Sequence, residues 1–214
     1  MKDICILSDF DGTITKKDGL YAFISLYAQE GWREFETLWA QGKINSKECL
    51  QKEFDYIENF SEELVENYIK TVETDDYFKE FYSYIRKNGI DFFVVSDGVD
   101  YFIERIFENI GIKDVKIISN HLEFNQNGYT LTFPNEDKTC KKSSGTCKCK
   151  VMSEMKKLYK KVIYIGDGIS DYCVCDKADI LYAKGKLINY CKQNNIKHIG
   201  FESFKDIIIT NFCS

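Results

Sequence analysis

Two aspartates follow an apolar segment near the start of the chain, in the stretch ICILSDFDGTIT. Asp9 and Asp11 stand two residues apart at the end of an expected strand, so their side chains should project from the same face. Such a pair can act as nucleophile and general acid–base, and it can also hold a divalent cation. Gly12 permits a tight turn, and the backbone N–H groups near Thr13 can bind an anion. Alone, the pair also fits a strand end that carries two solvated aspartates.

Further polar groups follow expected strands later in the chain. Ser96 ends the run FFVVS, where its hydroxyl can bind a phosphoryl oxygen. Asp167 and Asp171 follow VIYIG in the stretch GDGISD, and carboxylates of this kind are typical Mg²⁺ ligands. A loop between Ser96 and Asp167 carries Lys148 and Lys150, either of which offers an ammonium group to a phosphate. Because open α/β sheets bind ligands at the carboxyl ends of their strands, these groups predict a site for phosphate and Mg²⁺ at that edge.

Short apolar segments rich in Ile and Val would position these groups. Runs that are apolar at nearly every position are typical of strands buried on both faces of a parallel sheet. Helical patterns separate most of them, which predicts an α/β fold with helices on both faces of the sheet. The expected strands are residues 4–8, 92–96, 115–119, 162–166, 180–183 and 198–201.

Two segments depart from this alternation. Residues 16–75 show no convincing strand and carry amphipathic helical patterns, one of which begins at a capping serine, Ser61. The stretch HLEFNQNGYTLTF has two alternating runs around Asn127–Gly128, which predicts a small β-hairpin. We therefore expect a core domain made of residues 1–15 and 76–214, with residues 16–75 inserted as a helical domain.

The composition argues against several classes of protein. The 214 residues include 29 Lys and Arg against 34 Asp and Glu, a net charge of −5, which disfavours a nucleic-acid binder. The apolar run after Lys2 is too short for a signal peptide, and no window approaches the ~18 apolar residues of a membrane helix. Nine cysteines without a signal sequence are typical of reduced cytoplasmic thiols. We expect a cytoplasmic protein that binds neither nucleic acid nor membrane; its oligomeric state is open.

Five cysteines gather near the later motifs: Cys140, Cys147 and Cys149 in one loop, and Cys173 and Cys175 after GDGISD. Structural zinc sites usually match a C-x₂₋₄-C pair with a second pair or with histidines. C-x-C pairs are a poorer donor set, and the chain has 2 histidines. We favour thiols without metal, and we leave zinc binding by the loop cysteines open.

The motifs together resemble those of the haloacid dehalogenase (HAD) superfamily of aspartate-nucleophile phosphatases. DFDGT matches the family's first motif, DxDGT, and Ser96 fits the second. A loop lysine fits the third motif, and GDGISD matches the fourth, GDxxxD. The resemblance spans residues 9–171 and implies a Rossmann-like core with the family's helical C1 cap at residues 16–75.

A narrower resemblance is to subfamily IB, in the branch of 2-hydroxy-3-keto-5-methylthiopentenyl-1-phosphate phosphatase, which borders phosphoserine phosphatase. It is carried by DFDGTIT, SDGVDYFIERI, the hairpin and GTCK. Asp18 stands where phosphoserine phosphatase has an early cap glutamate, and Asp97 replaces the first glycine of its SGG motif. Both differences weaken phosphoserine as the substrate.

The resemblance implies a small phosphorylated metabolite as substrate. Phosphoserine, phosphocholine and phosphoethanolamine are alternatives, and a non-catalytic phosphate-binding regulator on the same fold is an alternative of another class. The residues expected to contact the substrate are Asp18, Ser96, Asp97, Gly98 and Lys148.

A mechanism follows from the same resemblance. Asp9 would attack phosphorus and form an aspartyl-phosphate, while Asp11 would protonate the leaving group and later deprotonate water. Mg²⁺ would bind the carboxylates of Asp9 and Asp167 and the main-chain carbonyl of Asp11.

The remaining motif residues would stabilise the phosphoryl group. Ser96 and the loop lysine would bind its oxygens, and Asp171 would orient the lysine or a water molecule. The alignment of GTCK with the branch favours Lys148 over Lys150 as that lysine.

Overall fold

The computed structural model describes residues 2–140 and 144–210. Its seven strands are β1 (Lys2–Ser8), β2 (Asp91–Val99), β3 (Lys116–Asn125), β4 (Gly128–Thr132), β5 (Tyr159–Gly166), β6 (Ile180–Ala183) and β7 (Ile199–Gly200). They form one sheet in the order β4-β3-β2-β1-β5-β6-β7. Neighbouring strands from β3 to β7 pair in parallel, and β4 pairs antiparallel with β3. The predicted parallel α/β fold is confirmed.

Each predicted strand is present, and the predicted hairpin is confirmed with one difference. The strand expected at 115–119 does not end before the hairpin, because β3 continues through it to Asn125. Asn125 pairs with Gly128, so the turn consists of residues 126–127 and lies one residue earlier than the predicted centre. Gly128 has a φ of +116°, a backbone conformation that glycine adopts without a Cβ clash.

Strand β2 runs past its predicted end at Ser96 and stops at Val99. Val95 and Val99 pair with residues of β3 that are only two apart, so β2 bulges between them. A bulge changes the direction in which side chains leave a strand. The residues in this bulge are Ser96, Asp97 and Gly98, the second sequence motif.

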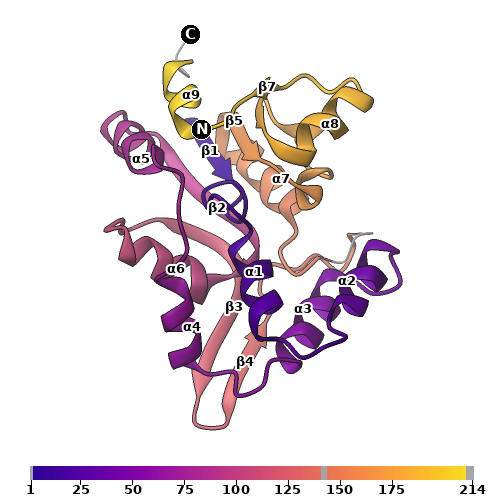
Figure 1. The fold of residues 1–214 in the computed structure, drawn as a ribbon. Coiled ribbons are helices and arrows are strands. Elements are labelled where there is room, and N and C mark those ends of the chain that lie inside the picture. The colour runs from indigo at the N-terminus through magenta and orange to yellow at the C-terminus, as the bar shows by residue number, and fades with distance from the viewer. Residues whose placement is uncertain (1, 141–143, 211–214) are drawn as a thin grey trace.

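The central strands are buried on both faces, as their apolar sequences predict. In β1, Ile6 belongs to one hydrophobic cluster, whereas Cys5 and Leu7 belong to the other. Helices α5, α6 and α9 cover the first face, and α7 and α8 cover the second (Figure 1). These helices are α5 (Phe78–Lys87), α6 (Asp100–Asn109), α7 (Lys148–Leu158), α8 (Gly185–Gln193) and α9 (Phe204–Ile209), with short 3₁₀ turns η1 (Ile169–Asp171) and η2 (Cys175–Lys177).

The insertion, residues 16–75, is helical and lies at the hairpin end of the molecule (Figure 1). Ser61 caps its last helix through a hydrogen bond from Leu64 N–H at 3.3 Å, as the sequence predicts. Thr15 and Thr74 form an antiparallel bridge where the insertion leaves the core. The division into core and cap domains stays a prediction. The insertion's helices are α1 (Gly19–Tyr27), α2 (Arg33–Ala40), α3 (Ser46–Asp55) and α4 (Glu62–Ile69).

The hairpin packs against the insertion. Tyr129 Oη donates a hydrogen bond to Asp55 Oδ1 at 2.5 Å and accepts one from Gln51 Nε2 at 2.9 Å. The ring of Phe60 lies 4.9 Å from that of Tyr129 and 5.3 Å from that of Phe124. The hairpin therefore packs against helix α3.

Within the described residues, each helix is too short or too polar to cross a membrane.

At the amino end of β2, one carboxylate joins three strands. Asp91 accepts hydrogen bonds from Lys2 Nζ at 2.7 Å, Tyr159 Oη at 2.8 Å and Lys116 Nζ at 3.2 Å. These donors belong to β1, β5 and β3. The hydrogen bond from Lys2, with those from Tyr159 and Lys116, lowers the pKa of Asp91 to about 2 although burial opposes the shift.

We expect Asp91→Asn to lower the free energy of unfolding by about 1 kcal/mol at neutral pH, a value reduced because both lysines are largely exposed. The folded pKa lies below the unfolded value of about 3.9, so the carboxylate stabilises the fold above that pH. Its contribution is lost as the pH falls toward about 2. Urea unfolding of both proteins should therefore show a difference at neutral pH that shrinks in acid.

Asp3→Asn is the matched control, because Asp3 is an exposed carboxylate of the neighbouring strand β1 that pairs with Lys160 at 2.7 Å. It should change stability little at either pH. A loss for Asp91→Asn that stays equal across the pH range would contradict the assignment.

Candidate active site

A buried lysine lies between two aspartates at the carboxyl edge of the sheet. Asp9 follows β1 directly, and Lys148 Nζ lies 2.9 Å from its Oδ1 and 2.7 Å from Asp171 Oδ1. Asp9 Oδ1 also accepts a hydrogen bond from Phe10 N–H at 2.8 Å. Burial acts to lower the pKa of Lys148, but the charges of Asp171 and Asp9 outweigh it and raise that pKa. The lysine therefore supplies a fixed positive charge beside Asp9.

Asp171 holds this lysine in place. It is fully buried, and its Oδ1 accepts hydrogen bonds from Tyr164 Oη at 2.6 Å and Lys148 Nζ at 2.7 Å. Its Oδ2 accepts hydrogen bonds from the N–H groups of Asp167 at 3.0 Å and Gly168 at 3.1 Å. Both carboxylate oxygens thus have two donors each, which suits a residue that positions Lys148.

The structure separates the two candidate lysines. Lys148 is the first residue of α7 and is 3% exposed, with its ammonium group at Asp9. Lys150 is exposed, and its Nζ lies 3.5 Å from the carbonyl oxygen of Glu136. Residues two apart on a helix point in different directions, so only one of this pair faces the aspartates.

Asp11 connects the sheet edge to the insertion. Its Oδ1 accepts hydrogen bonds from the N–H groups of Gly19 at 3.0 Å and Leu20 at 3.3 Å, at the start of α1. Burial, together with the negative charge of Asp18, raises the pKa of Asp11 to about 8. A raised pKa favours the protonated form of this carboxyl group, which can donate a proton. A Cβ on Gly98 would come within 3.0 Å of Asp11 Oδ2, so that glycine leaves the group room.

The position of the Asp167 side chain depends on two residues of the first motif. Its Oδ1 accepts a hydrogen bond from Thr13 Oγ1 at 2.8 Å. Gly12 has a φ of +71°, and a Cβ there would lie 2.6 Å from Asp167 Oδ2. Glycine is therefore required both for the turn and for the space beside this carboxylate.

Oxygens of Asp9, Asp167 and Asp171 all lie within 4.8 Å of one another. Because Asp171 already accepts four hydrogen bonds, Asp9 and Asp167 are the carboxylates left to bind a cation. An all-oxygen donor set of this kind fits a hard divalent cation.

The second motif is held by hydrogen bonds within the bulge of β2. Ser96 is 1% exposed, and its Oγ accepts a hydrogen bond from Gly98 N–H at 3.0 Å. Asp97 Oδ1 accepts one from Thr146 N–H at 2.9 Å, and the Asp97 carbonyl accepts one from Asn120 Nδ2 at 2.6 Å. Asp97 thus ties the bulge to the loop that precedes Lys148.

A pocket of about 620 Å³ opens between the α2–α3 turn and this edge of the sheet. Lys148 and Asp97 are in its wall. Asp18, Ser96 and Gly98, which the sequence also predicts to contact substrate, are not among the wall residues, and Asp18 caps α1 by accepting a hydrogen bond from Tyr21 N–H at 2.8 Å. The insertion contributes Trp39, Ala40, residues 42–46 and Glu48, and the core adds Asp97, Ser144, Thr146, Lys148, Ile169, Ser170 and Cys173.

Two site residues were missed by sequence reasoning. Ser170 Oγ accepts a hydrogen bond from Lys148 Nζ at 2.9 Å and lies 3.5 Å from Asp9 Oδ2. Tyr164 holds Asp171 from strand β5. Ser170 stands inside the GDGISD motif, which was a usable signal, whereas a tyrosine in a buried strand gives none.

Among the described residues, one further group of three possible metal ligands lies close together: Glu36, Cys49 and Glu53. Neither this group nor the aspartates contains a loop cysteine. The interpretation of the loop cysteines as thiols without metal stays a prediction.

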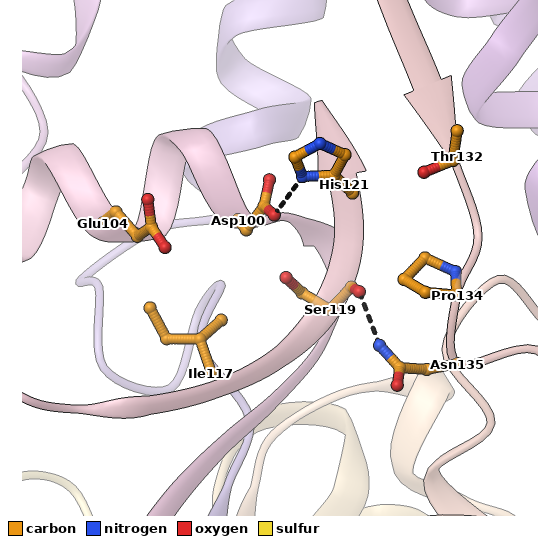
Figure 2. A pocket seen from close by; sticks show the side chains of 8 residues that line it. All are labelled: Asp100, Glu104, Ile117, Ser119, His121, Thr132, Pro134 and Asn135. Atoms are coloured by element: carbon orange, nitrogen blue, oxygen red, sulfur yellow. Dashed lines mark hydrogen bonds and ion pairs between the residues drawn. The ribbon is translucent and has the colours of Figure 1, made fainter. Parts of the chain in front are cut away.

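A second pocket, of about 320 Å³, lies beside α6 and β3 (Figure 2). His121 Nδ1 lies 2.6 Å from Asp100 Oδ2, and Asn135 Nδ2 donates to the carbonyl of Ser119 at 2.8 Å. Asp100 also accepts a hydrogen bond from Leu122 N–H at 3.0 Å. These contacts fasten the start of α6 to β3, and the wall includes no residue of the four motifs.

Comparisons with known proteins show that this chain is a phosphatase. The chain belongs to the family described as "Putative Phosphatase", whose profile matches residues 4–185. It is 30% identical over 206 residues to a 2-hydroxy-3-keto-5-methylthiopentenyl-1-phosphate phosphatase of Bacillus cereus. That alignment covers 95% of this chain and 94% of the relative.

Solved structures share the fold. A phosphoserine phosphohydrolase-like protein from Francisella tularensis has a TM-score of 0.71 at 21% identity, covering 99% of this chain and 100% of that one. A phospho-aspartyl intermediate analogue of phosphoserine phosphatase has a TM-score of 0.70 at 19% identity, with coverages of 98% and 99%. The predicted Rossmann-like HAD core is confirmed.

We expect Lys148→Ala to reduce kcat by about 10²-fold or more, because the positive charge beside Asp9 is lost. Lys150→Ala is the matched control and should stay near the wild-type rate. The measurement is phosphate release from p-nitrophenyl phosphate. Thermal unfolding should accompany it, because removing Lys148 leaves buried carboxylates without their partner. The reverse pattern, in well-folded variants, would assign the role to Lys150.

Proposed function

We propose that this protein is a Mg²⁺-dependent phosphomonoester hydrolase that acts on a small phosphorylated metabolite through an aspartyl-phosphate on Asp9. The contact of 2.9 Å between Lys148 Nζ and Asp9 Oδ1 carries the proposal. It puts a positioned positive charge beside a buried carboxylate, where a negatively charged phosphoryl group has to approach.

The two carboxylates of the first motif would divide the chemistry. Asp9 attacks phosphorus in line, the bond to the leaving oxygen breaks, and Asp11 gives that oxygen a proton. Water then attacks the phosphorus of the aspartyl-phosphate while Asp11 takes its proton, which frees Asp9 and releases phosphate. The pKa of about 8 supports Asp11 as the acid, since burial keeps it protonated at neutral pH.

Asp9, Asp167 and the main-chain carbonyl of Asp11 would hold Mg²⁺, which when bound would neutralise negative charge on the phosphoryl group. The donor chemistry supports this metal, because all three ligands are hard oxygens. Thr13 fixes one oxygen of Asp167, and Ser96 and Lys148 would bind phosphoryl oxygens.

The pocket supports a short, partly apolar substrate. Trp39, Ile44 and Ile169 give it an apolar wall close to Lys148. The Bacillus cereus relative is named for 2-hydroxy-3-keto-5-methylthiopentenyl-1-phosphate, whose methylthio end would suit such a wall. We propose a substrate of this type as the first candidate, ahead of phosphoserine, phosphocholine and phosphoethanolamine.

Phosphate release from these four compounds would test the proposal, with metal-free protein and with Mg²⁺ restored. We expect the highest kcat/KM for the methylthiopentenyl phosphate, no turnover after EDTA treatment, and recovery with Mg²⁺. Full activity after exhaustive chelation would contradict the metal assignment. Binding of phosphate without turnover of any compound would favour a non-catalytic regulator.

Asp9→Asn should abolish turnover while leaving the fold intact, because an amide is not a nucleophile at this position. Intact-protein mass spectrometry after acid quenching should detect a phosphorylated wild-type chain and no phosphorylated variant. If the folded variant hydrolyses p-nitrophenyl phosphate at near wild-type rate, the covalent mechanism is wrong.

Asp11→Asn should slow hydrolysis by about 10²- to 10⁴-fold for alkyl phosphates, whose leaving groups need a proton. The loss should be smaller for p-nitrophenyl phosphate in the first step, because its leaving group is already a stable anion. Single-turnover rates for both substrates separate the effects. Equal losses would argue against the acid role.

A further inference from the structure

The insertion contains a compact group of metal-ligand side chains away from the aspartates. Cys49 and Glu53 are four residues apart in α3, so both lie on one face of that helix. Glu36 reaches them from α2, and ligand atoms of the three residues all lie within 4.8 Å of one another. Two ligands one turn apart on a helix, completed by a residue of a neighbouring helix, is a common arrangement in protein metal sites.

Burial makes this group unusual. Cys49 is 3% exposed and Glu53 is 4% exposed, while Glu36 is half-buried. Glu53 Oε1 is inaccessible to solvent and has no hydrogen-bond partner. A buried polar atom without a partner is costly and rare in native proteins, and here it belongs to the very group that could share an ion.

Negative charge surrounds this group. Burial, together with the hydrogen bond and the charge of Glu36, raises the pKa of Glu53 to about 9, and the hydrogen bond with Cys49 opposes the rise while Asp18 adds to it. Burial and the charge of Glu53 also raise the pKa of Cys49. A divalent cation would give Oε1 a partner, balance the carboxylates and stabilise the thiolate.

We propose that Glu36, Cys49 and Glu53 form a site for a divalent transition metal of the Zn²⁺ class. A thiolate donor disfavours Mg²⁺ and Ca²⁺, whereas one sulfur with two carboxylate oxygens suits Zn²⁺ or Co²⁺. Three protein ligands leave a fourth position for water. The site differs in chemistry from the all-oxygen aspartate group, and it does not depend on the proposed phosphatase mechanism.

Such an ion would join the two helices that carry one wall of the large pocket. Glu36 lies three residues before Trp39, and Cys49 lies three residues after Ser46, and both of these neighbours line the pocket. Metal binding would therefore stabilise the α2–α3 turn over the sheet edge.

Titration of metal-free, reduced protein with Co²⁺ tests the site directly. Thiolate coordination gives cobalt a charge-transfer absorption band in the near ultraviolet that oxygen ligands alone do not give. We expect the band in wild-type protein and in Asp167→Asn, and its loss in Cys49→Ser. Cys147→Ser and Cys173→Ser are matched controls. Both should keep the band, because neither the loop residue Cys147 nor the pocket residue Cys173 belongs to the proposed site.

Glu53→Gln provides a second test that leaves the thiol in place. Competition against a chromogenic chelator should show Zn²⁺ binding about tenfold or more weaker than wild type. Thermal unfolding without metal should show that both variants are folded. Absence of the cobalt band in wild type, its survival in Cys49→Ser, or unchanged Zn²⁺ affinity in Glu53→Gln would each overturn the proposal.

Discussion

The pairing of Lys148 with Asp9 and Asp171 is the constraint on which the rest of this structure depends. Three buried ionisable groups lie together, because Lys148 Nζ is 2.9 Å from Asp9 Oδ1 and 2.7 Å from Asp171 Oδ1. Removing any one of them from water is expensive unless the others are positioned to compensate. The ends of β1 and β5 and the first turn of α7 therefore have to meet at one point, which the parallel sheet achieves by ending neighbouring strands at the same edge.

The two aspartates of the first motif are given different properties by their surroundings. Asp9 lies beside a lysine, whereas Asp11 accepts hydrogen bonds from the start of α1 and has the negative charge of Asp18 nearby. Burial raises the pKa of both carboxyl groups, to about 8 for Asp11, and the positive charge of Lys148 opposes the rise for Asp9 alone. Two identical side chains two residues apart can thus serve as nucleophile and acid.

The insertion is connected to the rest of the chain through at least two separate contacts. Asp11 binds the backbone of α1, and Tyr129 of the hairpin binds Asp55 of α3. The hairpin's position thus supports the helices whose connecting turn lines the large pocket. A change in the insertion would consequently affect both Asp11 and the pocket wall.

The sequence by itself determined the strands, the hairpin and the four motifs, because apolar runs and turn residues act locally. Tertiary structure decided which side chains face one another and which distant segments come into contact. Only the start of α7 shows that Lys148, and not Lys150, faces Asp9, and only the register of β2 against β3 extends the strand beyond Ser96. Glu36 lies 13 residues before Cys49 in sequence and meets it because α2 and α3 pack together. Such a contact arises from helix packing, for which the local sequence pattern carries no signal.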